Sequence, residues 1–230
     1  MSYKKNKKSK GELVYIANIR LLTEKAHGVQ VMKMCEAFSR LGLNVELWVP
    51  KRRSDIFDDP FEYYNIQNKF EIKKIPCLDF VFFDWRGIGF IFQTISFLFM
   101  SRIILLFRKS YPYIYTREPL TGFFFKDFYL ELHSLPNKIK KVNIWLWSKS
   151  KKIIVITSFI KKELIQVGIK NDIFVASDGV TLEDFSLNGS LADWRNEVGL
   201  PLNRKIIMYS GSFYLYDWKG VDVFLAATKM

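Results

Sequence analysis

The chain of 230 residues contains two histidines, His27 and His133, and each follows a short apolar segment of strand type. His133 comes directly after residues 129–132, whereas a longer loop separates His27 from residues 12–19. Ligands in open α/β sheets bind at the carboxyl ends of the strands. We therefore expect both histidines at the ligand-binding edge of a sheet, and a hydrogen-bonded core position is the alternative for His133.

Gly28 and Arg117 are candidate anion-binding residues for different reasons. Gly28 opens a segment with helical spacing, and the free N–H groups and the dipole of a helix N-terminus favour an anion. A glycine lets a phosphate or sugar approach the backbone, with an ordinary turn glycine as the alternative. Arg117 follows the segment 113–116, where its guanidinium can hold the anionic group of an acceptor or pair with Glu118.

A turn near the end of the sequence contains a second set of candidates. Gly211 and Ser212 follow the end of an apolar segment, and Lys219 stands before a segment of helical type. A lysine at the start of a helix can neutralise a diphosphate as a point charge. The alternative for Lys219 is a loop lysine surrounded by water.

The composition and the remaining motifs exclude several chemistries. Apolar residues make up 49% of the chain, which excludes a disordered segment. Two cysteines are too few for a disulfide framework or a cysteine-rich zinc module, and the low count suits a reducing cytoplasm. The G-x-G-x-x-G, G-x-S-x-G and H-E-x-x-H motifs are absent. With only two histidines, we expect no metal site.

Alternating strands and helices must position these candidates. Segments of strand type are residues 12–19, 45–49, 71–75, 113–116, 129–132, 152–157 and 172–177. Segments of helical type are residues 28–41, 84–109 and 158–168. Ser158 is the expected N-cap of the last of these helices. The alternation predicts an α/β fold with a doubly wound parallel sheet.

The composition of the sequence changes after residue 177, where a polar, turn-rich stretch resembles a linker. A short helix is expected at 191–199, a strand at 205–212 and a helix after it. We divide the chain into a basic tail (1–11), a first domain (12–180), a linker (181–203) and the start of a second domain (204–230). Since two elements cannot bury a core of their own, we expect the second domain to be truncated.

The net charge of +12 points to an anionic partner. Residues 1–10 contribute five lysines, and residues 133–162 contain eight lysines with Trp145 and Trp147 but no Asp or Glu. A basic helix with tryptophan is typical of docking on anionic lipid, and a solvated helix face is the alternative. The apolar segment 88–107 is long enough to span a bilayer, but its polar residues, among them Arg102, favour a buried or interfacial helix. No motif supports a nucleic-acid partner.

Seven segments in order make the chain resemble the glycosyltransferase family 4 type of GT-B enzyme. They are LTEKAHGVQVMKMCEAFSRLGLNVELWVP, DPFEYYNI, YTREP, ELHSLP, IVITSFIKKELIQVGI, VASDGVTLEDF and YSGSFYLYDWKGVDVFLAA. The resemblance covers nearly all of residues 12–230 and implies two Rossmann-like domains facing across a cleft. The N-terminal domain would bind the acceptor, and the C-terminal domain most of the nucleotide-sugar donor. It also implies transfer with retention of configuration and without a metal.

The resemblance assigns roles to individual residues. Gly28 matches the position whose backbone meets the donor diphosphate, with Gly211 and Ser212 in the corresponding turn of the second domain. His133 matches the histidine that contacts the donor sugar, and Lys219 matches the lysine that stabilises the departing diphosphate. Ser212 stands where many relatives have arginine, so one expected cation is missing or replaced.

The resemblance also implies paired glutamates that would lie beyond residue 230, so we expect the chain alone to be inactive. The expected enzyme is a hexosyltransferase acting on a glycan or lipid-linked acceptor, with His27, Arg117 and Glu118 on the acceptor side. It would work in the cytoplasm, peripherally on the inner face of the membrane, in cell-envelope polysaccharide synthesis. The alternatives are another GT-B enzyme, such as a nucleotide-sugar epimerase or a phosphorylase, and a non-catalytic membrane-binding module.

Overall fold

The computed structural model describes residues 11–228 except 53, 55, 82–86, 183–188 and 210–219. The chain divides into two compact units, Met1–Asp178 and Gly179–Met230. Each unit is described by itself below. The predicted tail over residues 1–10 lies outside the described residues, and the predicted domain limits at 180 and 203 stay predictions.

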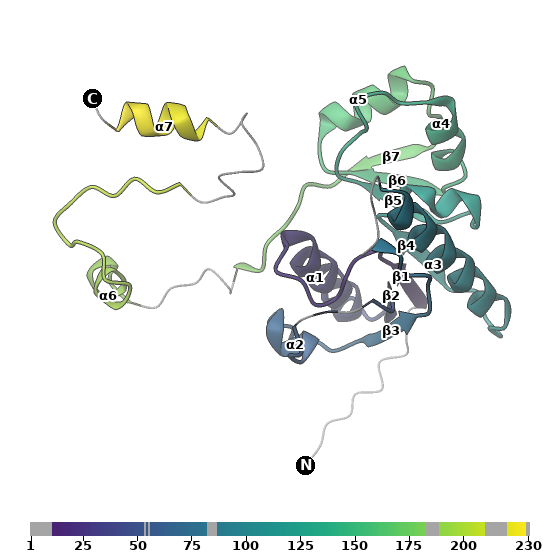
Figure 1. Ribbon diagram of the computed structural model, residues 1–230, viewed down its shortest axis with the longest axis horizontal. Helices are drawn as coiled ribbons and strands as arrows, with labels where there is room; N and C mark the ends of the chain where they lie inside the picture. The colour runs from purple at the N-terminus through teal and green to yellow at the C-terminus, as the bar shows by residue number, and fades with distance from the viewer. Residues whose placement is uncertain are drawn as a thin grey trace, which may run out of the picture. The chain divides into compact units, whose positions relative to one another are not determined.

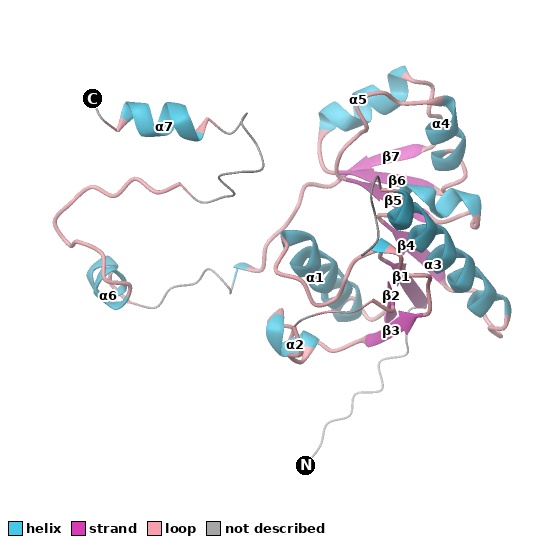
Figure 2. Cartoon of the chain, in the orientation of Figure 1, coloured by secondary structure: helices cyan, strands magenta, loops and turns pink. Residues whose placement is uncertain are grey.

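The first unit contains a parallel sheet of seven strands in the order β3-β2-β1-β4-β5-β6-β7 (Figures 1 and 2). The strands are β1 (Glu12–Ile16), β2 (Asn44–Pro50), β3 (Glu71–Ile75), β4 (Tyr113–Thr116), β5 (Tyr129–Leu132), β6 (Lys152–Val155) and β7 (Asp172–Val175). This arrangement confirms the predicted doubly wound α/β sheet.

Helices cover both faces of the sheet, with α1 on one face and α3 on the other (Figure 1). The helices of this unit are α1 (Ala26–Arg40), α2 (Pro60–Tyr63), α3 (Ile88–Leu106), the 3-10 helix η2 (Pro119–Phe123), α4 (Lys141–Trp147) and α5 (Ser158–Gln166). Side chains alternate along a strand, so Leu13 and Tyr15 pack under α1 while Val14 and Ile16 pack under α3. Burial on both faces explains why the central strands β1, β4 and β6 are mainly apolar, whereas the edge strand β3 is partly exposed and contains two lysines.

One local prediction about a helix is corrected by the structure. The N-cap of α5 is Thr157, whose hydroxyl accepts a hydrogen bond from the Ile160 amide at 3.2 Å, so Ser158 is already the first helical residue. Trp147 is buried at 1% exposure, whereas Trp145 is 52% exposed. Only one of the two tryptophans of the predicted lipid-docking helix is therefore available at the surface.

The second unit contains α6 (Leu191–Glu197) and α7 (Val221–Ala227). Ser190 caps α6 reciprocally with Asp193, which explains where this helix begins. The predicted strand at 205–212 is not formed over its described part, residues 205–209. A strand requires the hydrogen bonds of a neighbouring strand, and none pairs with this segment among the described residues.

α3 has the length and apolar composition that a membrane-crossing helix needs, although core helices of soluble proteins pass the same criterion. Its polar residues Gln93, Thr94 and Ser101 are fully buried against the rest of the protein. The buried side of α3 packs on the sheet through Phe97, Leu98 and Leu105. These contacts agree with the buried or interfacial helix that the polar residues of this segment predict.

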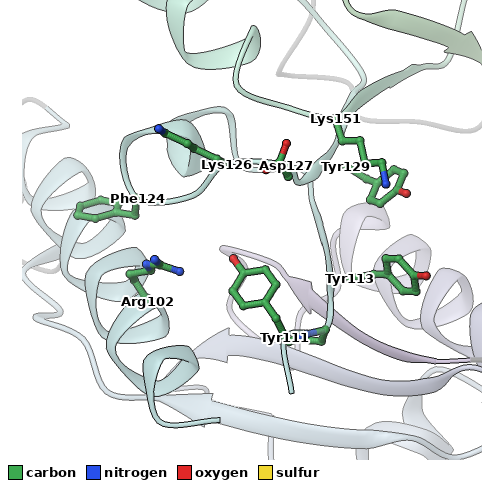
Figure 3. A pocket seen from close by; sticks show the side chains of 9 residues that line it. Arg102, Tyr111, Tyr113, Phe124, Lys126, Asp127, Tyr129 and Lys151 are labelled. Atoms are coloured by element: carbon green, nitrogen blue, oxygen red, sulfur yellow. The ribbon is translucent and has the colours of Figure 1, made fainter. Parts of the chain in front are cut away.

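A cavity of about 570 Å³ opens at the edge of the sheet formed by the amino ends of β4, β5 and β6 (Figure 3). Its lining residues are Arg102, Tyr111, Pro112, Tyr113, Phe124, Lys126, Asp127, Tyr129 and Lys151. The histidines follow the opposite, carboxyl ends of the strands. The cavity and the predicted site are therefore at different edges of the sheet.

Candidate functional site

The order of the strands reverses between β1 and β4. From β1 the chain passes through α1 to β2 on one side, and from β3 it passes through α3 to β4 on the other side. At such a switch point the connections leave in opposite directions, and a crevice forms at the carboxyl ends of the strands. The first turn of α1 and the residues after β4 and β5 therefore border the same crevice.

His133 lies at this edge beside a buried carboxylate. Glu131 is the third residue of β5, is 4% exposed, and shares a hydrogen bond with Nε2 of His133. The hydroxyl of Tyr115 in β4 donates to the other oxygen of Glu131 at 2.8 Å. Burial alone would raise the pKa of Glu131, but the hydrogen bonds from His133 and Tyr115 and the nearby charge of Arg117 lower it. Glu131 is therefore held as a carboxylate.

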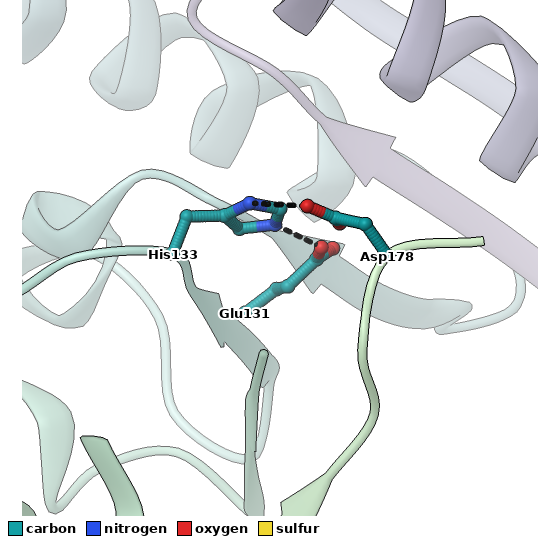
Figure 4. Close-up of side chains that lie close together, drawn as sticks. All are labelled: Glu131, His133 and Asp178. Atoms are coloured by element: carbon teal, nitrogen blue, oxygen red, sulfur yellow. Dashed lines mark hydrogen bonds and ion pairs between the residues drawn. The ribbon is translucent and has the colours of Figure 1, made fainter. Parts of the chain in front are cut away.

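Asp178 approaches the same imidazole from the segment after β7 (Figure 4). Its Oδ2 lies 3.7 Å from Nδ1 of His133. The ring of His133 is thus flanked by Glu131 at one nitrogen and by Asp178 at the other. Two carboxylates, one at each ring nitrogen, fix the orientation of the imidazole.

Gln30 of α1 connects this group to Arg117. Nη1 of Arg117 donates to Oε1 of Gln30 at 2.6 Å. The amide nitrogen of Gln30 donates to Asp178 and lies 3.3 Å from Nε2 of His133. Residues from α1, β4, β5 and the segments after β4, β5 and β7 thus form one network, called here the His133 cluster: Gln30, Tyr115, Arg117, Glu131, His133 and Asp178.

The His133 cluster contains the atoms of a metal-binding group. One ligand atom from each of Glu131, His133 and Asp178 lies within 4.8 Å of the others. These atoms already bond one another or Gln30, so binding an ion would require breaking those hydrogen bonds. The expectation of a site without metal stays a prediction.

The other candidates of the first unit are also placed by the structure. His27 is the second residue of α1, and burial together with the charges of Arg117 and Lys25 lowers its pKa. Glu118 accepts hydrogen bonds from Asn18 and from the Leu120 amide. Arg117 therefore pairs with Gln30, and both oxygens of Glu118 are bonded elsewhere. Burial raises the pKa of Glu118.

Gly28 is the third residue of α1 and is buried against Tyr64. A Cβ added at Gly28 would lie 2.6 Å from the Tyr64 hydroxyl and 2.7 Å from Cγ2 of Thr23. That hydroxyl both donates to the carbonyl of Thr23 at 2.9 Å and accepts from its amide at 2.8 Å. Packing thus requires a glycine here, and contact with a diphosphate stays a prediction.

The remaining predicted residues, Gly211, Ser212 and Lys219, lie outside the described residues. In the other direction, the sequence reasoning missed Gln30, Tyr115, Glu131 and Asp178. A signal was available for Glu131, because a charged residue inside the apolar segment Tyr-Leu-Glu-Leu needs a buried partner. Gln30 and Asp178 lie 148 residues apart in the chain, and no local pattern connects them.

No protein-family profile and no curated protein sequence matches the chain. Solved structures do match its fold. A glycosyltransferase from Rickettsia africae ESF-5 matches 95% of this chain with a TM-score of 0.60 at 16% identity. The apo form of the lipopolysaccharide outer core galactosyltransferase WaaB matches 74% of this chain with a TM-score of 0.50 at 14% identity. The chain covers 57% and 46% of these two structures, about half of their length. Its fold is the Rossmann-like α/β fold of the GT-B glycosyltransferases.

Proposed function

We propose that the chain belongs to a glycosyltransferase that moves a sugar from a nucleoside diphosphate-sugar to a glycan or lipid-linked acceptor. The His133 cluster is the observation that supports this most, because it places a cation, an imidazole and two carboxylates at the switch point of a GT-B-type sheet. Breaking the bond between sugar and diphosphate builds negative charge on the leaving oxygen. Preorganised cations and hydrogen-bond donors stabilise such charge.

In this proposal His133 is the catalytic residue of the described unit, and Glu131 is a positioning residue. His133 is 17% exposed at its side chain, so a sugar hydroxyl can reach the ring. Glu131 is buried behind it and holds the imidazole through its own bond to Tyr115. On the acceptor side we place His27, Arg117 and Glu118, and on the donor side Gly28, Gly211, Ser212 and Lys219.

We further propose a retaining transfer that requires no metal. Glu131 is hydrogen-bonded to His133, and one oxygen of Asp178 accepts a hydrogen bond from Gln30. With these atoms already bonded, the imidazole is oriented to contact a sugar and the group does not bind an ion. Lys219 would supply the positive charge at the leaving diphosphate that a metal supplies in other transferases.

The proposed place of action is the cytoplasmic face of a membrane, in cell-envelope polysaccharide synthesis. Both cysteines, Cys35 and Cys77, are free thiols, as is usual in a reducing compartment. The structural neighbour WaaB is named for lipopolysaccharide outer core, a glycan of the cell envelope. The excess positive charge of the chain favours an anionic membrane surface as a partner.

Replacing His133 by alanine tests the proposal in the protein as its own gene encodes it. Release of nucleoside diphosphate is measured with a panel of UDP-, GDP- and ADP-sugars in the presence of a membrane extract as acceptor. We expect H133A to lower turnover about 100-fold or more, because the contact acts on the reacting sugar. E131Q is expected to lower kcat with little change in KM, as a positioning residue would.

The control is K162Q, which removes an exposed lysine of α5 far along the chain from the cluster. Equal turnover of H133A and K162Q would rule out a role of His133 in catalysis. A non-catalytic membrane-binding module would show no nucleotide release with any donor.

The flanking carboxylates also support a second candidate, a nucleotide-sugar epimerase. An epimerase moves protons on the sugar, and Glu131 and Asp178 are carboxylates beside an imidazole. The same assay separates the two functions. An epimerase would convert the nucleotide-sugar into its isomer without passing the sugar to an acceptor.

A further inference from the structure

The cavity at the amino ends of β4, β5 and β6 has the lining of an anion site (Figure 3). Three cationic side chains line it, Arg102, Lys126 and Lys151, against one carboxylate, Asp127. None of the three has an ion-pair partner among the described residues. Guanidinium and ammonium groups with free donors are the usual partners of phosphate oxygens.

Tyrosine side chains also line the cavity. Tyr111, Tyr113 and Tyr129 line it, and Figure 3 shows Tyr129 and Lys151 on the side of it opposite Phe124 and Arg102. Nζ of Lys151 lies 6.0 Å from the centre of the Tyr129 ring. The cavity thus combines a net positive charge with the hydroxyl of Tyr111, which Figure 3 shows turned into it, and this combination suits a phosphate group.

An apolar surface adjoins the cavity on α3 and is called here the outer stripe. Its members are exposed, and their spacing along the sequence puts them on one side of the helix. They are Ile88, Ile91, Phe92, Ile95, Phe99 and Leu106. Their exposed fractions run from 39% for Ile95 to 63% for Leu106. Large apolar side chains gathered on one exposed face mark an interaction surface.

The cavity and the outer stripe form one continuous surface. Arg102 lies between Phe99 and Leu106 on the same side of α3 and lines the cavity. Phe124, another lining residue, packs on Phe99 with ring centres 6.2 Å apart. A ligand with an anionic head and an apolar body would match this arrangement.

The surface continues over η2 to α4. Phe123 packs on the exposed Trp145 with ring centres 5.9 Å apart, and Nζ of Lys149 lies 3.3 Å from the centre of the Trp145 ring. Further lysines precede or begin α4, at positions 138, 140 and 141. Tryptophan with flanking lysines suits the boundary between lipid headgroups and acyl chains.

We propose that this surface docks on a bilayer containing anionic phospholipids, with the outer stripe in the headgroup–acyl boundary and one lipid phosphate in the cavity. α3 lies in the interface and does not cross the bilayer, because its polar residues Gln93, Thr94 and Ser101 are fully buried against the protein. Charge decides between a bilayer and a second copy of the chain. Two copies would bring the same basic residues together, whereas an anionic bilayer neutralises them.

The test is co-sedimentation of the full chain with vesicles of phosphatidylcholine, with and without phosphatidylglycerol. R102Q/K151Q removes two cavity charges, and K162Q/K170Q removes two exposed lysines elsewhere, so both variants carry the same net charge. We expect R102Q/K151Q to bind anionic vesicles about tenfold more weakly than the wild type and K162Q/K170Q less than about twofold more weakly. F92S/F99S, in the outer stripe, is expected to lose binding as well.

Several results would overturn the proposal. Equal weakening by the two charge-matched variants would show that net charge alone drives binding. Binding of soluble glycerol 3-phosphate that R102Q/K151Q abolishes, without binding of the wild type to anionic vesicles, would make the cavity a site for a free phosphate. A dimer in solution that F92S/F99S dissociates would assign the outer stripe to a second copy of the chain. Thermal unfolding of each variant verifies that it is folded, and binding is measured without reference to turnover.

Discussion

Glu131 shows at the scale of one residue how a buried charge organises the site. It is almost fully buried, yet its neighbours hold it ionised, since both of its oxygens receive hydrogen bonds. A buried carboxylate without such partners would destabilise the fold by several kcal/mol. The fold therefore requires hydrogen bonds to the Glu131 carboxylate, and one of these hydrogen bonds fixes the His133 ring.

Gly28 leads to a prediction about stability. G28A places a methyl group against the Tyr64 hydroxyl and Thr23, and Tyr64 is only 3% exposed. We expect a loss of about 1–3 kcal/mol, as for other overpacked positions, and a thermal midpoint lower by roughly 2–10 °C. Thermal unfolding followed by circular dichroism measures it.

G179A is the matched control for this substitution, because no atom lies within 4 Å of a Cβ built at Gly179. It should leave the midpoint unchanged. If G28A were as stable as G179A, packing against Tyr64 would not be the reason for glycine at position 28.

Single residues also mark what the sequence could reveal about the site. The positions of His133, His27 and Arg117 after strand-like segments predict the carboxyl edge for them, and the helical spacing after Gly28 predicts a helix N-terminus; the structure has these residues at those places. The partners of His133 could not be found in this way. Asp178 reaches the ring only because β7 lies two strands away from β5 in the sheet, which is a tertiary relation.

At the scale of elements, the strands were the most predictable part of the fold. Most strands of the sheet are rich in β-branched or aromatic residues, and burial on both faces makes the central strands conspicuous in the sequence. Helix ends were less predictable, as the N-cap of α5 shows, because Thr157 and Ser158 are both suitable caps and only the backbone geometry chooses between them. The segment 205–209 has the composition of a strand, but no strand pairs with it within the part of the chain that the structure describes.

Glu46 joins three elements at the other end of the sheet and yields a prediction for acid stability. Oxygens of this β2 carboxylate accept hydrogen bonds from Arg108 after α3, from Lys73 of β3 and from Trp48, at distances of 2.8 to 3.0 Å. Burial alone would raise its pKa, but these hydrogen bonds lower it from 4.5 to about 2. The ionised form therefore stabilises the fold by about 3 kcal/mol at neutral pH.

The sign of the pH dependence follows from the lowered pKa. The stabilisation is fully present above the unfolded pKa and is lost as the pH falls from about 5 towards 2. Urea unfolding at several pH values should show this decline in the wild type and a shallower one in E46Q, which has no carboxylate to protonate. Parallel declines would contradict the assignment.

At the scale of the whole molecule, chemistry is distributed over the two edges of one sheet. The carboxyl edge carries the His133 cluster, where Arg117 faces carboxylates, and the amino edge carries a cavity with an excess of cations. The net charge predicts an anionic partner but not where it binds. The eight lysines between 133 and 162 point to α4, whereas the cavity with its excess of cations lies at the amino edge of the sheet. Nearly all of α3 is apolar, so only the structure distinguishes the side that packs on the core from the side that is exposed.

Activity without a metal is a prediction for the whole protein under the proposed function. Turnover is expected to be unchanged by EDTA, because Glu131, His133 and Asp178 are bonded to one another or to Gln30. Restoration of lost activity by Mg²⁺ or Mn²⁺ after EDTA treatment would instead make the three residues a metal site. The wild-type protein assayed without EDTA is the reference.

The central claim, that the His133 cluster serves transfer of a sugar from a nucleotide donor, is tested most directly by accounting for both products in one reaction. The released nucleoside diphosphate and the sugar incorporated into acceptor are measured together, for the wild type and for H133A. We expect equal amounts of both products from the wild type and a loss of about 100-fold in both for H133A. Conversion of the donor to an isomer without incorporation, or undiminished incorporation by H133A, would contradict it.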